Sequence, residues 1–269
     1  MTLRKSNIAK RLITAVLLIP IVALIIIYSS DFIFLIILIL FITIANIEFV
    51  GLIRSSGQKI LVLPVVTGTI LLPVSFYLQD KDLILFSIFA VMLLSFTIKL
   101  LGNQPLTDTY KTISFTLVAV LYVPFFLSFI FWVKTENIHY IFYILFIIWA
   151  SDTSGYLIGS KFGTTKLYKK ISPNKTIEGL IASYIGGLII AFLYAVLFIE
   201  IPYIDTFFSG LLIISAGILG DLVESMFKRR SGIKDSGFIF PGHGGMLDRI
   251  DSLLMAFPIL YFYISFSLN

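Results

Sequence analysis

Residues 31–52 read DFIFLIILILFITIANIEFVGL, with charges only at Asp31 and Glu48. An apolar run of about 20 residues is long enough for a helix to cross the hydrocarbon core of a bilayer. The whole chain has this character, with 58% hydrophobic and 13% charged residues. Soluble proteins average roughly 25% charged residues. The composition therefore predicts an all-α, polytopic integral membrane protein.

Apolar runs separated by charged or turn-forming breaks predict about nine transmembrane helices. A basic segment before the first run resembles the start of a signal peptide, but residues 19–30 offer no convincing cleavage site, so we expect a retained helix. The predicted spans are approximately 12–28, 31–52, 60–78, 83–100, 112–133, 138–158, 177–199, 207–227 and 250–267.

The basic residues predict the orientation of these spans. With a cytoplasmic N-terminus, all of the 20 lysines and arginines except Lys81 and Lys134 fall on the cytoplasmic side, as the positive-inside rule requires. We therefore expect a protein of the cytoplasmic (inner) membrane. Basic groups that follow a membrane face favour lipid contact, and no nucleic acid partner is expected.

No stretch of ordinary globular composition is long enough for a soluble domain, so residues 1–269 are predicted to form a single membrane domain. Within it, we expect lipid-embedded N-terminal helices over 1–135 and a catalytic half over 136–269. Two cytoplasmic loops, 159–176 and 228–249, belong to the catalytic half. The chain has no cysteine, which excludes disulfides, thiolate metal sites and a cysteine nucleophile.

A charged stripe leads into the loop 228–249. Two carboxylates and an ammonium group on one helix face can hold a cation beside a phosphate. An ionised Asp221 within an apolar run is costly unless it is paired or metal-bound. For the bases that follow, anchoring to anionic lipid headgroups is the alternative. The stripe consists of Asp221, Glu224, Ser225 and Lys228.

The far end of this loop is rich in glycine. Residues 241–245, Pro-Gly-His-Gly-Gly, precede the last span, so we expect several unpaired backbone amides there, an arrangement that attracts phosphate. Asp248 and Asp251 follow one helical turn apart. Capping explains one such acid, but two acids with Arg249 between them indicate a site. His243 is interpreted as a phosphate donor or a turn residue rather than a general base.

The second charged connection lies between the spans 138–158 and 177–199. Helical spacing places Asp152, Gly155, Tyr156 and Gly159 on one face, where small residues permit close packing beside a buried acid. The lysines of the loop 159–176 fit either membrane anchoring or phosphate binding, and Lys175 is the preferred phosphate ligand. Glu178 lies near the start of the next helix in a plausible capping arrangement.

These motifs resemble the signature of the CDP-diacylglycerol synthases, also called phosphatidate cytidylyltransferases. A pattern with so many fixed polar positions is much more specific than a short glycine motif. Residues 152–159 and 172–179 resemble two further motifs of that family, whereas the first five spans resemble it only in apolar character and order. The signature reads Ser225-x-Phe227-Lys228-Arg229, Lys234-Asp235-x-Gly237 and Pro241-x-His243-Gly244-Gly245-Met246-x-Asp248-Arg249-Ile250-Asp251, without a departure.

The resemblance implies transfer of CMP from CTP to phosphatidate, giving CDP-diacylglycerol and pyrophosphate at the cytoplasmic face of the membrane. It also implies a magnesium-dependent reaction, leaves a second cation open, and suggests a homodimer. The lipid phosphate is already anionic, so it needs positioning and charge neutralisation rather than a general base.

We predict that Asp221 and Asp248 hold the metal and, together with Lys228, are the catalytic residues. Three of the other acids, at positions 152, 224 and 251, are either further metal ligands or groups that orient the bases. The expected substrate-binding residues are Lys175, Arg229, Lys234, Asp235, His243, Gly244, Gly245, Arg249, Asp152, Glu224 and Asp251.

Alternatives of two classes stay open. Among enzymes, a CDP-alcohol phosphotransferase is disfavoured because its motif is not found, whereas an archaeal ether lipid as acceptor is harder to exclude. In the other class, a transporter or channel would use Glu48, Asp152 and Asp221 as an ion path. Against it, the acids gather at one membrane face and no internal repeat is detected. Glu48 stays unassigned, and a solvated helix end is favoured over an ion path.

Overall fold

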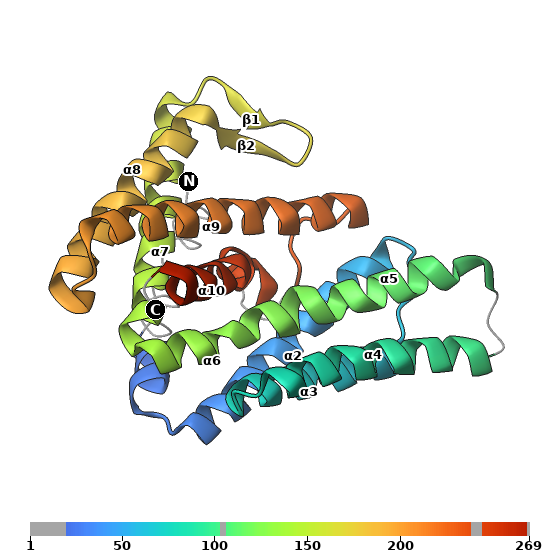
Figure 1. The fold of residues 1–269 in the computed structure, drawn as a ribbon. Helices are drawn as coiled ribbons and strands as arrows, with labels where there is room; N and C mark the ends of the chain where they lie inside the picture. Colours follow the sequence, from blue (N-terminus) through green and yellow to red (C-terminus); the bar gives the residue numbers. More distant parts are fainter. Residues whose placement is uncertain (1–19, 103–105, 238–243, 268–269) are drawn as a thin grey trace. The chain divides into compact units, whose positions relative to one another are not determined.

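The computed structural model describes residues 20–102, 106–237 and 244–267, and helices dominate it (Figure 1). The predicted first span, 12–28, lies partly outside these residues, and its described part, 20–28, is helical. The other long helices are α2 (Asp31–Ser55), α3 (Val62–Tyr77), α4 (Lys81–Leu101), α5 (Thr109–Val120), α6 (Phe126–Glu136), α7 (Ile138–Phe162), α8 (Ile177–Tyr194), α9 (Tyr203–Ser231) and α10 (Leu247–Ser267).

Seven helical segments in the described part of the chain are long and apolar enough to cross a membrane. A further apolar helix, α3, is shorter. Each predicted span from 31–52 to 250–267 overlaps one of these segments. The protein is therefore an all-α, polytopic membrane protein, while the number of nine spans and the cytoplasmic N-terminus stay predictions.

The predicted span 112–133 contains an internal irregularity. A π-helical turn, η2 (Leu121–Phe125), joins α5 to α6 and contains Pro124. Proline lacks the N–H that an α-helix needs at an interior position, and a π-turn is a common way to accommodate the missing bond. The helical segment Leu106–Glu136 therefore continues through Pro124, and it is long and apolar enough to cross a membrane once.

The chain forms two compact units. The first unit contains the described parts of Met1–Phe125 and Ile233–Arg249, and the second contains those of Phe126–Gly232 and Ile250–Asn269. The loop between α9 and α10 thus belongs to the first unit, although the two helices that flank it belong mostly to the second.

In the first unit, α2 packs against α3 and the α5–η2 segment. The side chains of Phe49, Leu72 and Phe76 are fully buried there. A buried hydrogen bond joins the two helices, from Asn46 Nδ2 to Thr69 Oγ1 at 2.9 Å. This polar contact gives the apolar interface a fixed register, because a buried amide without a partner is costly.

In the second unit, α7 and α8 pack very closely, and Figure 1 shows α8 running back along α7. A Cβ at Gly155 would collide with the side chain of Ser183, and a Cβ at Gly159 would lie 3.3 Å from the Cα of Gly179. Small residues on both helices let the backbones approach. The predicted close packing along the 152–159 face is confirmed.

The predicted loop 159–176 contains a small antiparallel hairpin of β1 (Lys166–Tyr168) and β2 (Ser172–Thr176). The Thr176 side chain caps α8 by accepting the Gly179 N–H at 3.1 Å. Glu178 accepts hydrogen bonds from the Thr164 hydroxyl at 2.7 Å and the Thr165 N–H at 3.1 Å. The hairpin is therefore fixed to the first turn of α8, which settles where β2 presents its side chains.

Candidate functional site

Three aspartates from three helices of the second unit lie close enough to interact electrostatically. Asp221 of α9 interacts with Asp152 of α7 and with Asp251 of α10, and the last two also interact with each other. Asp152, which the sequence predicts to be buried, is exposed, and the other two are partly exposed. Like charges held together repel one another, so this cluster requires cations.

Glycines bring α9 and α10 together beside these aspartates. A Cβ at Gly220 would collide with the backbone oxygen of Asp251, and a Cβ at Gly217 would contact the side chain of Ser252 at 3.6 Å. Residue 220 must therefore lack a side chain, because α9 and α10 have to approach closely for the carboxylates of Asp221 and Asp251 to interact. The sequence pattern Gly-Asp at 220–221 has this packing function in addition to its chemistry.

Two lysines lie among the aspartates. Lys175 Nζ of β2 is 2.8 Å from Asp221 Oδ2, and Lys228 Nζ of α9 is 2.5 Å from Glu224 Oε2. Lys175 also interacts with Asp152, and Lys228 with Asp251. The Glu224 side chain is fully buried. This cluster still holds two more acidic groups than lysines, so its chemistry suits a further cation.

The charged stripe predicted for α9 is present. Ser225 Oγ donates to Asp221 Oδ1 at 3.2 Å, and Lys228 pairs with Glu224 one turn away. Helical spacing alone was sufficient to place these four side chains together, because residues three and four apart lie on one face.

The loop between α9 and α10, residues 232–246, carries the central part of the signature motif and is called the signature loop. In the first unit, its described part is organised around Asp248. Its Oδ2 atom accepts three hydrogen bonds, from Ser236 N at 3.0 Å, Ser236 Oγ at 2.9 Å and Gly245 N at 2.7 Å. Gly244 has a φ of +82°, a conformation that favours glycine. Residues from both described arms of the loop, Ser236 and Gly245, therefore donate hydrogen bonds to Asp248.

Glu48 is the residue that sequence reasoning misplaced. Its predicted role as a solvated helix end is wrong, because the residue is only 8% exposed. Its carboxylate accepts the Met246 N–H at 3.1 Å and the Leu247 N–H at 2.8 Å. The available signal was the carboxylate itself, since an acid inside an apolar run needs a partner.

The same contacts correct the prediction of unpaired amides at the start of the last helix. The amides of Gly245, Met246 and Leu247 donate to Asp248 or Glu48. The protein itself supplies the anions that a helix N-terminus attracts. The Gly245 amide, predicted to cradle a phosphate, is thus already engaged by a carboxylate.

The other predicted site residues have varied surroundings. Arg229 is exposed, and its Nε donates to the Ile171 carbonyl at 3.0 Å, which ties α9 to the hairpin. Lys234, Asp235 and Arg249 are exposed. His243 lies outside the described residues. Asp221 and Asp248 belong to different units, so their pairing around one metal stays a prediction.

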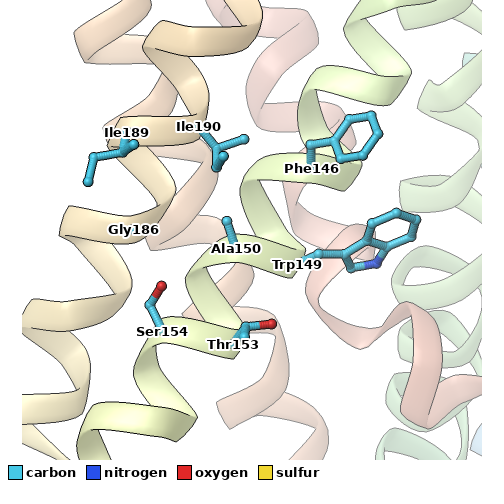
Figure 2. Close-up of a pocket in the computed structure, with 8 residues that line it drawn as sticks. All are labelled: Phe146, Trp149, Ala150, Thr153, Ser154, Gly186, Ile189 and Ile190. Carbon is cyan, nitrogen blue, oxygen red and sulfur yellow. The ribbon is translucent and has the colours of Figure 1, made fainter. Parts of the chain in front are cut away.

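A groove of about 470 Å³ lies between α7 and α8 on the second unit. Figure 2 shows the hydroxyls of Thr153 and Ser154 at one end and the ring of Phe146 toward the other. The lining between them is apolar, and the hydroxyl end directly follows Asp152 in sequence. The lining residues are Phe146, Trp149, Ala150, Thr153, Ser154, Gly186, Ile189 and Ile190.

Comparisons with known proteins agree with this combination of apolar helices and charged loops. The model of the cytidylyltransferase family matches residues 9–267. The chain is 37% identical over 232 residues to a phosphatidate cytidylyltransferase of Bacillus subtilis (strain 168), covering 80% of this chain and 83% of that protein. It is 40% identical over 214 residues to a phosphatidate cytidylyltransferase of Staphylococcus aureus (strain COL), covering 78% and 77%. Since the family model spans nearly the whole chain, this membrane protein belongs to the cytidylyltransferase family and is a nucleotidyltransferase.

Proposed function

We propose that this protein transfers the cytidylyl group of CTP to phosphatidate, forming CDP-diacylglycerol and pyrophosphate. The observation that carries the proposal is the cluster of Asp152, Asp221 and Asp251 with Lys175 and Lys228, held by three membrane helices and a hairpin. Acids and bases gathered at one place suit a reaction between two phosphate-bearing substrates. The names of the relatives supply the substrates themselves.

In the proposed reaction, a phosphatidate oxygen attacks the α-phosphorus of CTP in line, and the bond to the pyrophosphate leaving group breaks. Lys175 and Lys228 would exchange their carboxylate partners for phosphate oxygens and offset the charge of the reacting groups. The exposed Arg229, Lys234 and Arg249 would hold the outer phosphates. Positioning and charge neutralisation therefore supply the catalysis, and no residue has to remove a proton.

Magnesium is the proposed cofactor, and carboxylate oxygens are the ligands it prefers. Among residues 20–102, 106–237 and 244–267, no three acidic or histidine side chains converge as a ready metal cage. Magnesium commonly uses one or two carboxylates and keeps several waters, so the aspartates fit it as donors. We propose Asp221 and Asp248 as ligands, with Asp152 and Asp251 as supporting groups. Bound magnesium would neutralise phosphate charge.

The location of the site and the assembly state belong to the same proposal. The basic side chains of the two loops favour the cytoplasmic face of the inner membrane for the reaction, by the positive-inside rule. CTP is water-soluble, whereas the diacylglycerol part of phosphatidate stays in the bilayer, so a site at the membrane surface serves both. A homodimer is expected only from the family resemblance.

The purified protein in mixed micelles should convert radiolabelled CTP and phosphatidate into a lipid-soluble cytidine product. Chelation of divalent cations should abolish the conversion, and added magnesium should restore it, because the site holds more acids than lysines. Scintillation counting of the organic phase measures the product. Absence of any lipid-soluble label would refute the proposed reaction and favour a transporter.

The groove between α7 and α8 is proposed to hold one acyl chain of the lipid substrate. Ala150→Phe would fill part of it, so KM for a long-chain phosphatidate should rise about tenfold, while KM for a short-chain phosphatidate and for CTP should stay near wild type. Steady-state kinetics with both lipids measure the difference.

Ile181→Phe is the matched control for the groove, because Ile181 is an exposed apolar residue of α8 that does not line it. It adds a ring to the same pair of helices without filling the groove. Equal kinetics for Ala150→Phe and Ile181→Phe with the long-chain substrate would remove the groove from the proposal.

A further inference from the structure

Glu48 is a buried acid that the proposed reaction does not use. It lies on α2, in the N-terminal half of the chain, where no family-like motif was found. An ionised carboxylate buried among apolar side chains is costly unless hydrogen bonds compensate it. Two backbone amides donate to this one, those of Met246 and Leu247 at 3.1 and 2.8 Å, and the Ser236 hydroxyl lies 3.3 Å away.

The backbone of the signature loop packs directly on this carboxylate. A Cβ at Gly237 would overlap Oε1 of Glu48, and a Cβ at Gly245 would overlap Oε2. The two glycines therefore enclose the carboxylate from both arms of the loop. A side chain at either position would force Glu48, the loop, or both to move.

Glu48 is linked to Asp248 in two ways. The Ser236 hydroxyl lies 3.3 Å from Glu48 Oε2 and 2.9 Å from Asp248 Oδ2. A hydroxyl carries one proton and donates it to one acceptor at a time, and the shorter distance favours Asp248. In addition, the two amides that Glu48 holds belong to Met246 and Leu247, the two residues directly before Asp248. Fixing these amides fixes the backbone from which Asp248 projects.

We propose that Glu48 is a positioning residue for Asp248: it anchors the first turn of α10 to α2 and so holds the Asp248 carboxylate in place. This inference rests on the proposed function, in which Asp248 serves the phosphate site. It assigns a defined task to α2, one of the N-terminal helices.

Glu48→Gln tests the proposal because it keeps the volume of the side chain but replaces one acceptor oxygen by an NH2 donor. The NH2 group of glutamine cannot accept a hydrogen bond from a backbone N–H. At least one of the Met246 and Leu247 amides therefore loses the oxygen that accepts its hydrogen bond. Amide hydrogen exchange at Met246 and Leu247 should accelerate about tenfold or more. The kcat should fall about tenfold, with KM for CTP within about threefold of wild type.

Asn46→Ala is the matched control. Asn46 lies on the same helix, is 2% exposed, and donates to Thr69. Its loss removes a buried hydrogen bond of α2 without touching the loop. We expect a lower thermal midpoint, but unchanged exchange at Met246 and Leu247 and an unchanged kcat.

Gly237→Ala provides a second variant in case Glu48→Gln does not fold. It removes no charge and no hydrogen-bonding group, yet its Cβ would displace the Glu48 carboxylate. The same rise in exchange and the same fall in kcat are expected. Shortening the acid in Gly237→Ala/Glu48→Asp should restore part of the kcat, because the new methyl group gains room.

Wild-type exchange rates in Glu48→Gln would overturn the proposal, and so would a kcat loss no greater than that of Asn46→Ala. The exchange measurement needs no substrate. If the wild-type protein made no CDP-diacylglycerol, the proposed function would fail, while the exchange at Met246 and Leu247 would still decide whether Glu48 anchors the loop.

Discussion

Asp221→Asn should lower the rate of CDP-diacylglycerol formation by about 10³-fold, while the protein remains folded in detergent. The substitution keeps the shape of the side chain but removes its charge. Asp221 pairs with Lys175 at 2.8 Å and interacts with Asp152 and Asp251, so its charge connects all parts of the cluster. Steady-state turnover with saturating CTP and phosphatidate measures the loss, and size-exclusion chromatography in detergent reports the fold.

Asp205→Asn is the control for this experiment. Asp205 lies on the same helix, sixteen positions earlier or about 24 Å along the axis, and accepts a hydrogen bond from the Tyr263 hydroxyl at 2.7 Å. Removing its charge should leave turnover near wild type. If Asp221→Asn kept more than about a tenth of the wild-type rate, the loss would be smaller than removal of a single stabilising group from an active site usually gives. Asp221 would then not belong to the catalytic machinery.

Lys228→Met should both destabilise the protein and remove most of its activity. Glu224 is fully buried, and Lys228 is its ion-pair partner at 2.5 Å. Removing one partner of a buried pair costs on the order of 3 kcal/mol, because the remaining charge loses its compensation. For a chain of this size, the midpoint of thermal unfolding should fall by roughly 6 °C or more. A thermal-shift assay in detergent measures it.

A double variant separates the two roles of Lys228. In Lys228→Met/Glu224→Gln, both charges are absent, so the thermal midpoint should return most of the way to wild type. Turnover should stay low, since the ammonium group proposed to meet phosphate is still missing. Recovery of both stability and turnover would instead make Lys228 a structural partner of Glu224 alone.

Local patterns in the sequence predicted a large part of this molecule. The length of the apolar runs placed the helices, because a bilayer demands about 20 apolar residues per span. Helical spacing placed Ser225 beside Asp221 and Lys228 beside Glu224. The small residues at 155 and 159 correctly indicated the close contact with α8. Each of these contacts lies within one helix or between two helices that follow one another in the sequence.

Relations between distant segments were the ones that sequence reasoning missed. Lys175 was chosen for its position before a helix, but its pairing with Asp221 depends on how the hairpin is fixed to α8. The glycine-rich turn was expected to leave its amides open for phosphate. Nothing local to that turn indicates that an acid nearly 200 positions earlier occupies them. Contacts of this kind follow from the packing of the helices, which single-sequence periodicity does not contain.

The contact between Glu48 and the signature loop also sets an order of events during biosynthesis. The separation between Glu48 and its partner Leu247 is 199 positions along the chain. At about 5–20 residues per second, the ribosome needs roughly 10–40 s to produce the partner after α2 has been made. During that time, the membrane-inserted helix carries an acid without its final partners. Completion of the loop is therefore a late step of folding, and a newly made chain can be inserted in the membrane well before it can be active.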